Sequence, residues 1–332
     1  IRILNMTIQN FVPLQPMSQF DVDVEEGQNT EFHPLLPPPI YVVPYPFMPP
    51  PPAPENTDRK RGTGWNPSIR YFIIGIIELL ILLLLFYKTV RTDLPDKSNC
   101  LSEDGTYDLC YCEAFSDSYV LERANTYSAL AFSALGFVIL YSLSRIPPPQ
   151  ITNTMTQNII YSAVYGYLEV FMGPGSMLFH ATMSNLGGFF DTLSMYMWLS
   201  YVLVYDILRL TNISNIIGAI LYIFVVALCV VLQEIVFQGG DLTFALLVFA
   251  TLGAELVVYL RSRNNLNKTA YYYFIGALLI YAVAMVIWQL SKTGGPLCFP
   301  DSILQGHAIW HTLSAVTVSL IYVYLKKAND PQ

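Results

Sequence analysis

The stretch Tyr71–Tyr87, which reads YFIIGIIELLILLLLFY, decides the fold class of this chain. Its only charged residue is Glu78. An apolar run of this length is typical of a helix that crosses the hydrocarbon core of a bilayer. A lone carboxylate at that depth is costly unless it is protonated or partnered. Glu78 therefore indicates either a helix–helix contact or a neutral, inert acid.

Comparable apolar runs recur along the rest of the chain between short polar breaks. The chain is 54% hydrophobic and 12% charged, with a mean hydropathy of +0.45. A soluble domain cannot bury so much apolar surface, whereas lipid can solvate it. We therefore predict an all-α polytopic membrane protein. Its eight expected helices are 71–88, 122–143, 157–180, 187–208, 214–235, 241–260, 270–290 and 303–325.

Residues 1–68 differ sharply from the rest of the chain, because they are polar and rich in proline. Such a composition favours polyproline II structure and cannot form a core by itself. We expect this arm to be held against its own bundle or against a neighbouring subunit, and we favour a protein partner or a second copy. Nucleic acid is not expected as a partner, because no basic stripe is present.

The basic residues near the predicted helix ends orient the bundle. With eight spans, eleven of them fall on one side and fewer on the other, and the positive-inside rule assigns the richer side to the cytosol. These residues are Arg59, Lys60, Arg61, Arg70, Arg145, Arg209, Arg261, Arg263, Lys268, Lys326 and Lys327. Both termini should therefore be cytosolic, and the acidic loop 93–121 lumenal or extracellular. The sequons at Asn5, Asn212 and Asn267 should then carry no glycan.

The cysteines test this topology independently. Four of them, Cys100, Cys110, Cys112 and Cys298, fall on the outer side, whereas Cys229 lies within a span. Clustering on a non-cytosolic face indicates disulfide bonds. The sequence leaves three pairings open.

Three of the four histidines lie at the outer ends of predicted helices. His180 closes one helix, and His307 and His311 open the last, whereas His33 belongs to the proline-rich arm. The spacing in HAIWH places both imidazoles on one helical face. Three neutral imidazoles with one open position are typical of a catalytic zinc site. A single histidine in a span is more often a packing residue, but three at one depth favour a metal.

Two further polar residues lie close to these histidines in the predicted bundle. Ser176 precedes His180 by one turn, and Asp191 begins the next helix after a short turn. A carboxylate beside an activated water is what proton transfer requires. These positions therefore predict the catalytic side chains of a hydrolase.

The combination of GSMLFHATM, Asp191 and HAIWH resembles the alkaline ceramidase family, part of the CREST superfamily of seven-helix membrane hydrolases. The likeness covers about residues 105–325. It implies a seven-helix hydrolase domain over residues 122–327, preceded by an extra transmembrane helix at 69–92. It also implies zinc held by the three histidines, with Ser176 and Asp191 beside the reacting groups. The expected products from ceramide are a sphingoid base and a fatty acid.

The family also has an Asp-Trp-Cys-Glu motif that contributes to a calcium site. This sequence reads Asp108-Leu109-Cys110-Tyr111-Cys112-Glu113, followed by Glu122. The resemblance implies calcium held by Asp108, the carbonyl of Leu109, Glu113 and Glu122, with Tyr111 replacing an expected acidic ligand. The same alignment pairs Cys110 with Cys298 and leaves Cys100 for Cys112.

Two other functions remain compatible with the sequence. One is a related hydrolase that acts on another acylated lipid. The other is a non-catalytic ceramidase-like subunit of a larger membrane assembly, which the arm and the extra helix would favour.

Overall fold

The computed structural model describes residues 69–92, 111–145, 153–211, 213–237 and 240–331. Within these ranges the chain forms helices and loops and no strand. The proline-rich arm, Asp108, Leu109, Cys100 and Cys110 lie outside them. The predictions about those residues therefore remain predictions.

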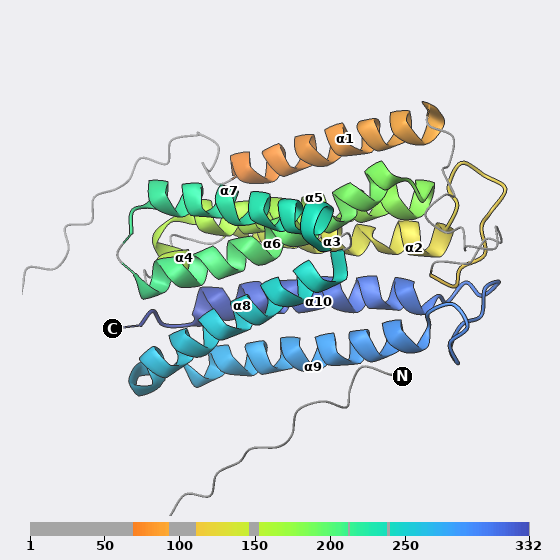
Figure 1. Cartoon of the computed structure of the whole chain (residues 1–332). Helices are drawn as coiled ribbons and strands as arrows, with labels where there is room; N and C mark the ends of the chain where they lie inside the picture. The colour runs from red at the N-terminus through yellow and green to blue at the C-terminus, as the bar shows by residue number, and fades with distance from the viewer. Residues whose placement is uncertain (1–68, 93–110, 146–152, 212, 238–239, 332) are drawn as a thin grey trace, which may run out of the picture. The chain divides into compact units, whose positions relative to one another are not determined.

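Among the described residues, eight long helices and two short ones, α2 and α4, follow one another along the chain (Figure 1). The helices are α1 (Ile69–Thr92), α2 (Arg123–Ser128), α3 (Leu130–Arg145), α4 (Thr154–Gln157), α5 (Ile159–Thr182), α6 (Asn185–Leu210), α7 (Asn215–Val231), α8 (Gly240–Ser262), α9 (Lys268–Leu290) and α10 (Gly306–Lys327). A π-helical segment, Leu232–Phe237, continues α7, and a 3-10 turn, Arg263–Asn265, follows α8.

Each predicted helix is present, with ends that differ by a few residues. The predicted helix 122–143 is divided at Ala129 into α2 and α3. The break ends α2 after six residues, two of which, Asn125 and Ser128, lie next to His311.

In the part of the chain that the structure describes, six segments are long and apolar enough to cross a membrane: 69–91, 123–143, 215–236, 242–265, 268–290 and 306–327. The prediction of an all-α polytopic membrane protein is therefore confirmed. Helices α5 and α6 have similar lengths, 24 and 26 residues, but are not among these six. The count of eight spans remains a prediction.

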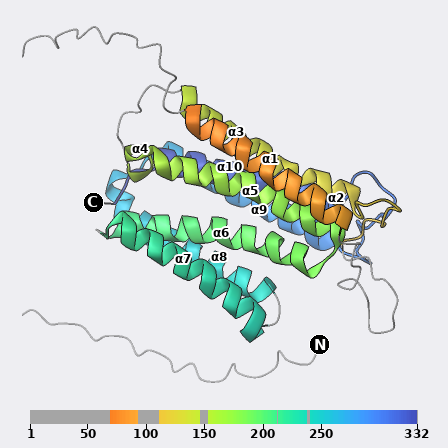
Figure 2. The same ribbon diagram turned by 90° about the horizontal axis from the view of Figure 1, so that it is seen from above.

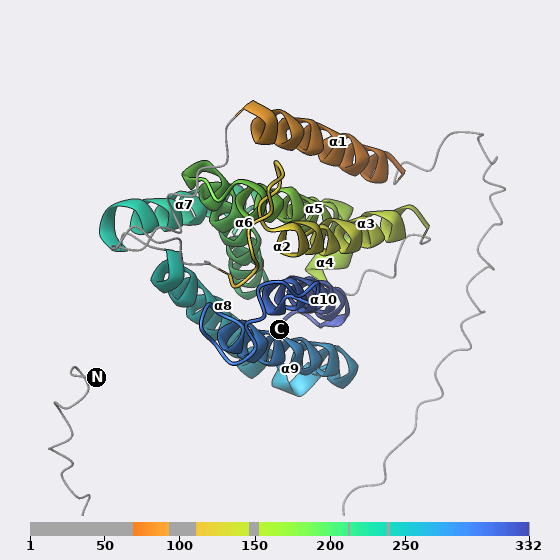
Figure 3. The same ribbon diagram turned by 90° about the vertical axis from the view of Figure 1, so that its right-hand side faces the viewer.

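Helix α10 lies between α9 on one side and α2, α3 and α5 on the other, while α1 packs on the outside of α3 and α5 (Figures 2 and 3). The Tyr167 hydroxyl of α5 donates a hydrogen bond to the Tyr71 carbonyl oxygen of α1 at 3.0 Å. Glu78 is half-buried and lies one turn after Gly75, where a built Cβ atom would meet Leu140, Phe137 and Tyr167. It is therefore close to the face of α1 that packs on α3 and α5.

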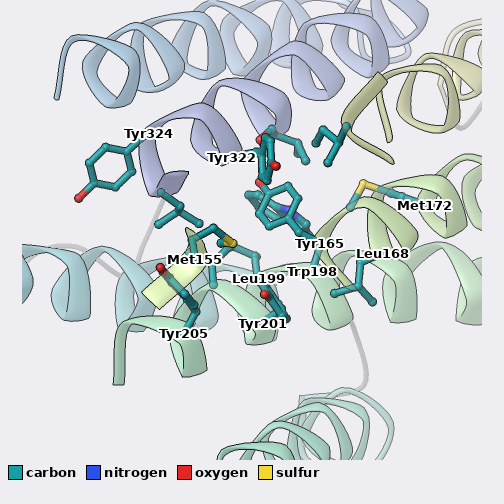
Figure 4. Packing of buried hydrophobic residues seen from close by; sticks show 14 of the residues in the cluster. Met155, Tyr165, Leu168, Met172, Trp198, Leu199, Tyr201, Tyr205, Tyr322 and Tyr324 are labelled. Atoms are coloured by element: carbon teal, nitrogen blue, oxygen red, sulfur yellow. The ribbon is translucent and has the colours of Figure 1, made fainter. Parts of the chain in front are cut away.

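Loops 111–121 and 291–305 lie at one end of the bundle, and the C-terminus lies at the other (Figure 1). We call the first the histidine end, after His180, His307 and His311, and the second the arginine end, after Arg209. Between them lies a core rich in tyrosine (Figure 4). Tyr165 donates its hydroxyl hydrogen to the Val318 carbonyl oxygen at 2.6 Å, which satisfies a polar group in the interior.

Two glycines let α3 and α5 approach closely. A Cβ atom built on Gly136 would lie 2.8 Å from both the Gly166 carbonyl oxygen and the Val170 nitrogen. Small residues allow such backbone contact between helices in a membrane. Helix α5 carries Ser176 and His180, so this contact fixes one side of the site.

We predict that Gly136→Ala lowers the stability of the protein by about 1–3 kcal/mol, because the neighbouring backbone must move. The matched control is Gly253→Ala on α8, where a Cβ atom meets nothing within 4 Å. Thermal unfolding in detergent would measure both variants. Equal melting temperatures would contradict the close α3–α5 contact.

Candidate metal centre

His180, His307 and His311 converge at the histidine end of the bundle. One ring nitrogen from each lies within 4.8 Å of the others, and all three side chains are buried. His180 lies in the last turn of α5, and the other two lie in the first turns of α10. The i, i+4 spacing therefore places two imidazoles on one helical face, as the sequence predicted.

The orientation of His180 is set by Glu122, which is fully buried. The Nδ1 atom of His180 lies 2.7 Å from Oε2 of Glu122. The Glu122 backbone N–H donates to the His180 carbonyl oxygen at 3.1 Å, which fixes the carboxylate next to the ring. A carboxylate can only accept a hydrogen bond, so Nδ1 is the donor and Nε2 of the neutral ring keeps its lone pair.

The orientation of His311 is set by helix α2. Its Nδ1 atom lies 3.1 Å from the Asn125 carbonyl oxygen and 2.8 Å from the Ser128 hydroxyl. Because a carbonyl can only accept, Nδ1 is again the donor. The Nε2 atom of His311 is therefore also unprotonated and points away from α2.

Aromatic rings fix the plane of His307. The ring stacks on Trp310 with centroids 5.1 Å apart and an interplanar angle of 16°. Tyr111 lies on the ring as well, at 4.2 Å. These contacts confine the imidazole without using its nitrogens.

The arrangement of nitrogens fits a divalent metal. The Nε2 atoms of His180 and His307 are 3.1 Å apart, and the lone pair on His180 faces its neighbour. Buried lone pairs that face one another are unfavourable unless a proton or a cation lies between them. Carboxylate and carbonyl partners behind ligating imidazoles are usual at metal sites. The three residues predicted as zinc ligands therefore form a candidate metal centre.

The two predicted catalytic residues lie beside this centre. The Ser176 hydroxyl lies 3.3 Å from Nε2 of His311. The Asp191 carboxylate interacts with that hydroxyl and with His180. Gly175 allows α5 and α6 to pack closely enough to bring Ser176 and Asp191 together, because a Cβ atom on Gly175 would lie 3.0 Å from the Phe190 carbonyl oxygen of α6. The structure thus brings all five predicted residues together.

The sequence does not reveal several residues that support the metal centre. It gives no role at the centre to Asn125 or Ser128, and it marks Tyr111 only as the residue that replaces an acidic calcium ligand. Their signal was weak, because polar residues at the start of a helix usually serve as caps. Glu122 was expected to bind calcium, and its bond to His180 was not foreseen.

The disulfide prediction was wrong in its pairing. Cys112, and not Cys110, is bonded to Cys298, with Cα atoms 5.5 Å apart. The Ala114 N–H donates to the Pro300 carbonyl oxygen at 3.0 Å, so the two loop segments run together just beyond the bond. Cys110 and Cys112 are separated by one residue in the sequence. The contact between the two loops therefore explains why Cys112 is the one that faces Cys298.

The same shift bears on the predicted calcium ligands, which were placed by aligning Cys110 with the cysteine of the family motif. Both oxygens of Glu113 accept backbone N–H bonds, from Ala124 at 2.6 Å and Asn125 at 2.8 Å. Burial raises the pKa of the Glu113 carboxyl above its ordinary value, while these donors act in the opposite direction. Glu113 therefore caps α2. A calcium ion at Asp108, Leu109, Glu113 and Glu122 stays a prediction.

An apolar cavity of about 160 Å³ begins next to the metal centre. Phe132 and Trp310 line it, and they also contact His311 and His307. The cavity continues between α6, α8, α9 and α10. The site can therefore receive an apolar group from within the bundle.

We predict that Glu122→Gln weakens zinc binding about 10–100-fold, because the amide no longer fixes the tautomer of His180. Competition with a chromophoric chelator would measure the affinity. The control is Glu234→Gln, an exposed position outside the site. If both variants bound zinc like the parent chain, the role of Glu122 would be refuted.

We predict that a non-reduced protease digest contains a peptide pair joined through Cys112 and Cys298. Mass spectrometry would identify it, and Cys110→Ser should leave it intact. Loss of the cross-link in Cys110→Ser would instead support the original pairing.

Comparison with known proteins agrees with the geometry of the site. A search of curated proteins finds no match to the chain. A protein-family model described as Ceramidase matches residues 103–329, which include helices α2 to α10 and every residue of the metal centre. Because the match covers more than half of the sequence, the chain belongs to the ceramidase family.

Proposed function

We propose that this protein is a zinc-dependent amide hydrolase that cleaves ceramide into a sphingoid base and a fatty acid. One observation carries the proposal. Two imidazoles are locked with unprotonated Nε2 atoms toward a common point, a third faces it, and Ser176 and Asp191 lie beside it. Membership of the ceramidase family supports the substrate.

A zinc ion held by the three imidazoles would supply Lewis acidity and a water that is reactive at neutral pH. The protein residues have separate tasks. Glu122, Asn125 and Ser128 hold the imidazoles in the ligating tautomer. The burial of the site limits competing water, which strengthens each electrostatic interaction within it.

Asp191 is the proposed proton carrier. Its carboxylate takes a proton from the attacking water as a carbon–oxygen bond forms at the amide carbon. It returns that proton to the nitrogen as the carbon–nitrogen bond breaks, so the amine leaves neutral. Ser176 donates a hydrogen bond to the amide oxygen while negative charge develops there.

The apolar cavity is the proposed site for an alkyl chain of the substrate. It begins at Phe132 and Trp310, beside the ligating rings, and its walls come from six helices, α3, α5, α6, α8, α9 and α10. A lipid bound there would place its amide at the metal centre. A soluble amide would gain little from these walls, which favours a lipid substrate.

We further propose that the histidine end faces the lumen or the cell exterior. Arg261, Arg263, Lys326 and Lys327 all lie at the arginine end, at the termini of α8 and α10. The positive-inside rule favours the cytosol for that end. The disulfide at the histidine end suits an oxidising compartment.

We predict that the purified zinc-loaded protein releases fatty acid from ceramide, and that a zinc chelator stops the reaction. His307→Ala should abolish both zinc binding and turnover, whereas Asp191→Asn should retain zinc and lower kcat about 10²–10⁴-fold. His33→Ala, at the one histidine outside the site, serves as the control.

The outcomes separate the alternatives. Release of fatty acid from other acylated lipids, with ceramide untouched, would change the substrate and keep the chemistry. Zinc binding without turnover of any lipid in a membrane extract would support a non-catalytic subunit. Unchanged activity in His307→Ala would refute the proposal.

A further inference from the structure

The walls of the apolar cavity follow the length of the bundle. On α10 they form a single stripe, with Trp310, Ser314, Val318, Ile321 and Tyr324 in order. These positions recur every three or four residues and therefore share one helical face. Trp310 and Tyr324 are about 21 Å apart, given a rise of about 1.5 Å per residue. The cavity is thus long enough for an extended alkyl chain.

Helix α6 provides a second stripe over the same length. Met195, Leu199, Val202 and Asp206 line the cavity in that order. Asp191 at the metal centre lies one turn before Met195. Both helices therefore place the reacting groups at one end of the cavity and Asp206 or Tyr324 at the other.

Charged groups that are almost fully buried lie at the far end of the cavity, where Asp206 and Glu255 line it. Asp206, Arg209 and Glu255 are 0%, 6% and 5% exposed. The NH1 atom of Arg209 lies 3.2 Å from Asp206 and 3.6 Å from Glu255. Tyr324 donates its hydroxyl hydrogen to Glu255, and Tyr271 donates to the same oxygen at 3.3 Å.

The residues after α10 hold this cluster from outside. Arg209 donates from Nε to Asp330 at 3.2 Å and from NH2 to the Asn329 carbonyl oxygen at 3.1 Å. Asp330 also accepts from the backbone N–H and the hydroxyl of Thr154, at 2.6 and 2.7 Å. Each of the three guanidinium nitrogens of Arg209 therefore has an oxygen partner.

We propose that this cluster is the floor that sets the longest alkyl chain the enzyme accepts. The inference rests on the proposed function. A methyl terminus that reaches Asp206 and Glu255 cannot go further without separating buried charges from their partners, which is strongly unfavourable. Each methylene placed above the floor adds about fourfold to affinity. Affinity therefore rises with chain length and then stops rising at one length.

Two substitutions move the floor in opposite directions. Leu325 is buried and lines the cavity beside Tyr324, so Leu325→Ala deepens it. Val202 lies one turn above Asp206, so Val202→Met fills that space. The matched control is Leu256→Ala, because Leu256 follows Glu255 but is 56% exposed and lines no part of the cavity.

The experiment uses the zinc-loaded full chain and ceramides that differ only in acyl length. For the parent protein kcat/KM should rise with length and then fall. Leu325→Ala should lengthen the preferred chain by about three carbons, which is the number it removes. Val202→Met should shorten it, and Leu256→Ala should leave it unchanged. The same preferred length in all four proteins would overturn the proposal.

A second measurement separates this proposal from the proposed function. Binding of saturated fatty acids of increasing length, followed by the shift in melting temperature, requires no turnover. A length limit that moves in Leu325→Ala, in a protein that does not hydrolyse ceramide, would support the floor and refute the function. Turnover of ceramide with a length limit that is the same in every variant would support the proposed function and refute the floor.

Discussion

The structure depends on which ring nitrogen of His180 and of His311 carries the proton, because both imidazoles are buried. His180 and His311 each donate Nδ1–H to a buried acceptor, and both Nε2 atoms are thereby directed to one point. With the opposite tautomers, Glu122 and the Asn125 carbonyl oxygen would lose their donors in a medium of low dielectric. The ligating state of the imidazoles is therefore the favoured state of the protein, before any metal binds.

Helix α2 and the loop that precedes it hold the groups around the three imidazoles in place. Helix α2 presents the Asn125 carbonyl oxygen and the Ser128 hydroxyl to His311, and Glu113 accepts from the N–H groups of Ala124 and Asn125 in its first turn. The bond between Cys112 and Cys298 holds Tyr111 on the ring of His307. Loss of the Glu113 carboxylate would leave two N–H groups of α2 without an acceptor, and loss of the Glu122 carboxylate would do the same to Nδ1–H of His180.

Sequence patterns predicted the parts of this structure that depend on local periodicity. The long helices follow from apolar runs of spanning length, and the pair in HAIWH follows from helical spacing. The choice between Cys110 and Cys112, and the roles of Asn125 and Ser128, depend on contacts between segments far apart in the chain. The arginine-end cluster did leave a signal, because Asp206 and Glu255 lie inside predicted spans, where charge is costly unless it is paired.

Helix α10 links the two ends of the bundle in one rigid element. Its first turns carry His307 and His311, its last turns carry Tyr324, and no glycine or proline lies between them. Helix α5, in contrast, contains Pro174, which removes a backbone hydrogen bond next to Ser176. The distance from His307 and His311 to Tyr324 at the arginine end is therefore fixed by an uninterrupted helix. The proposed limit on chain length depends on this rigidity, because the floor must stay at one distance from the reacting groups.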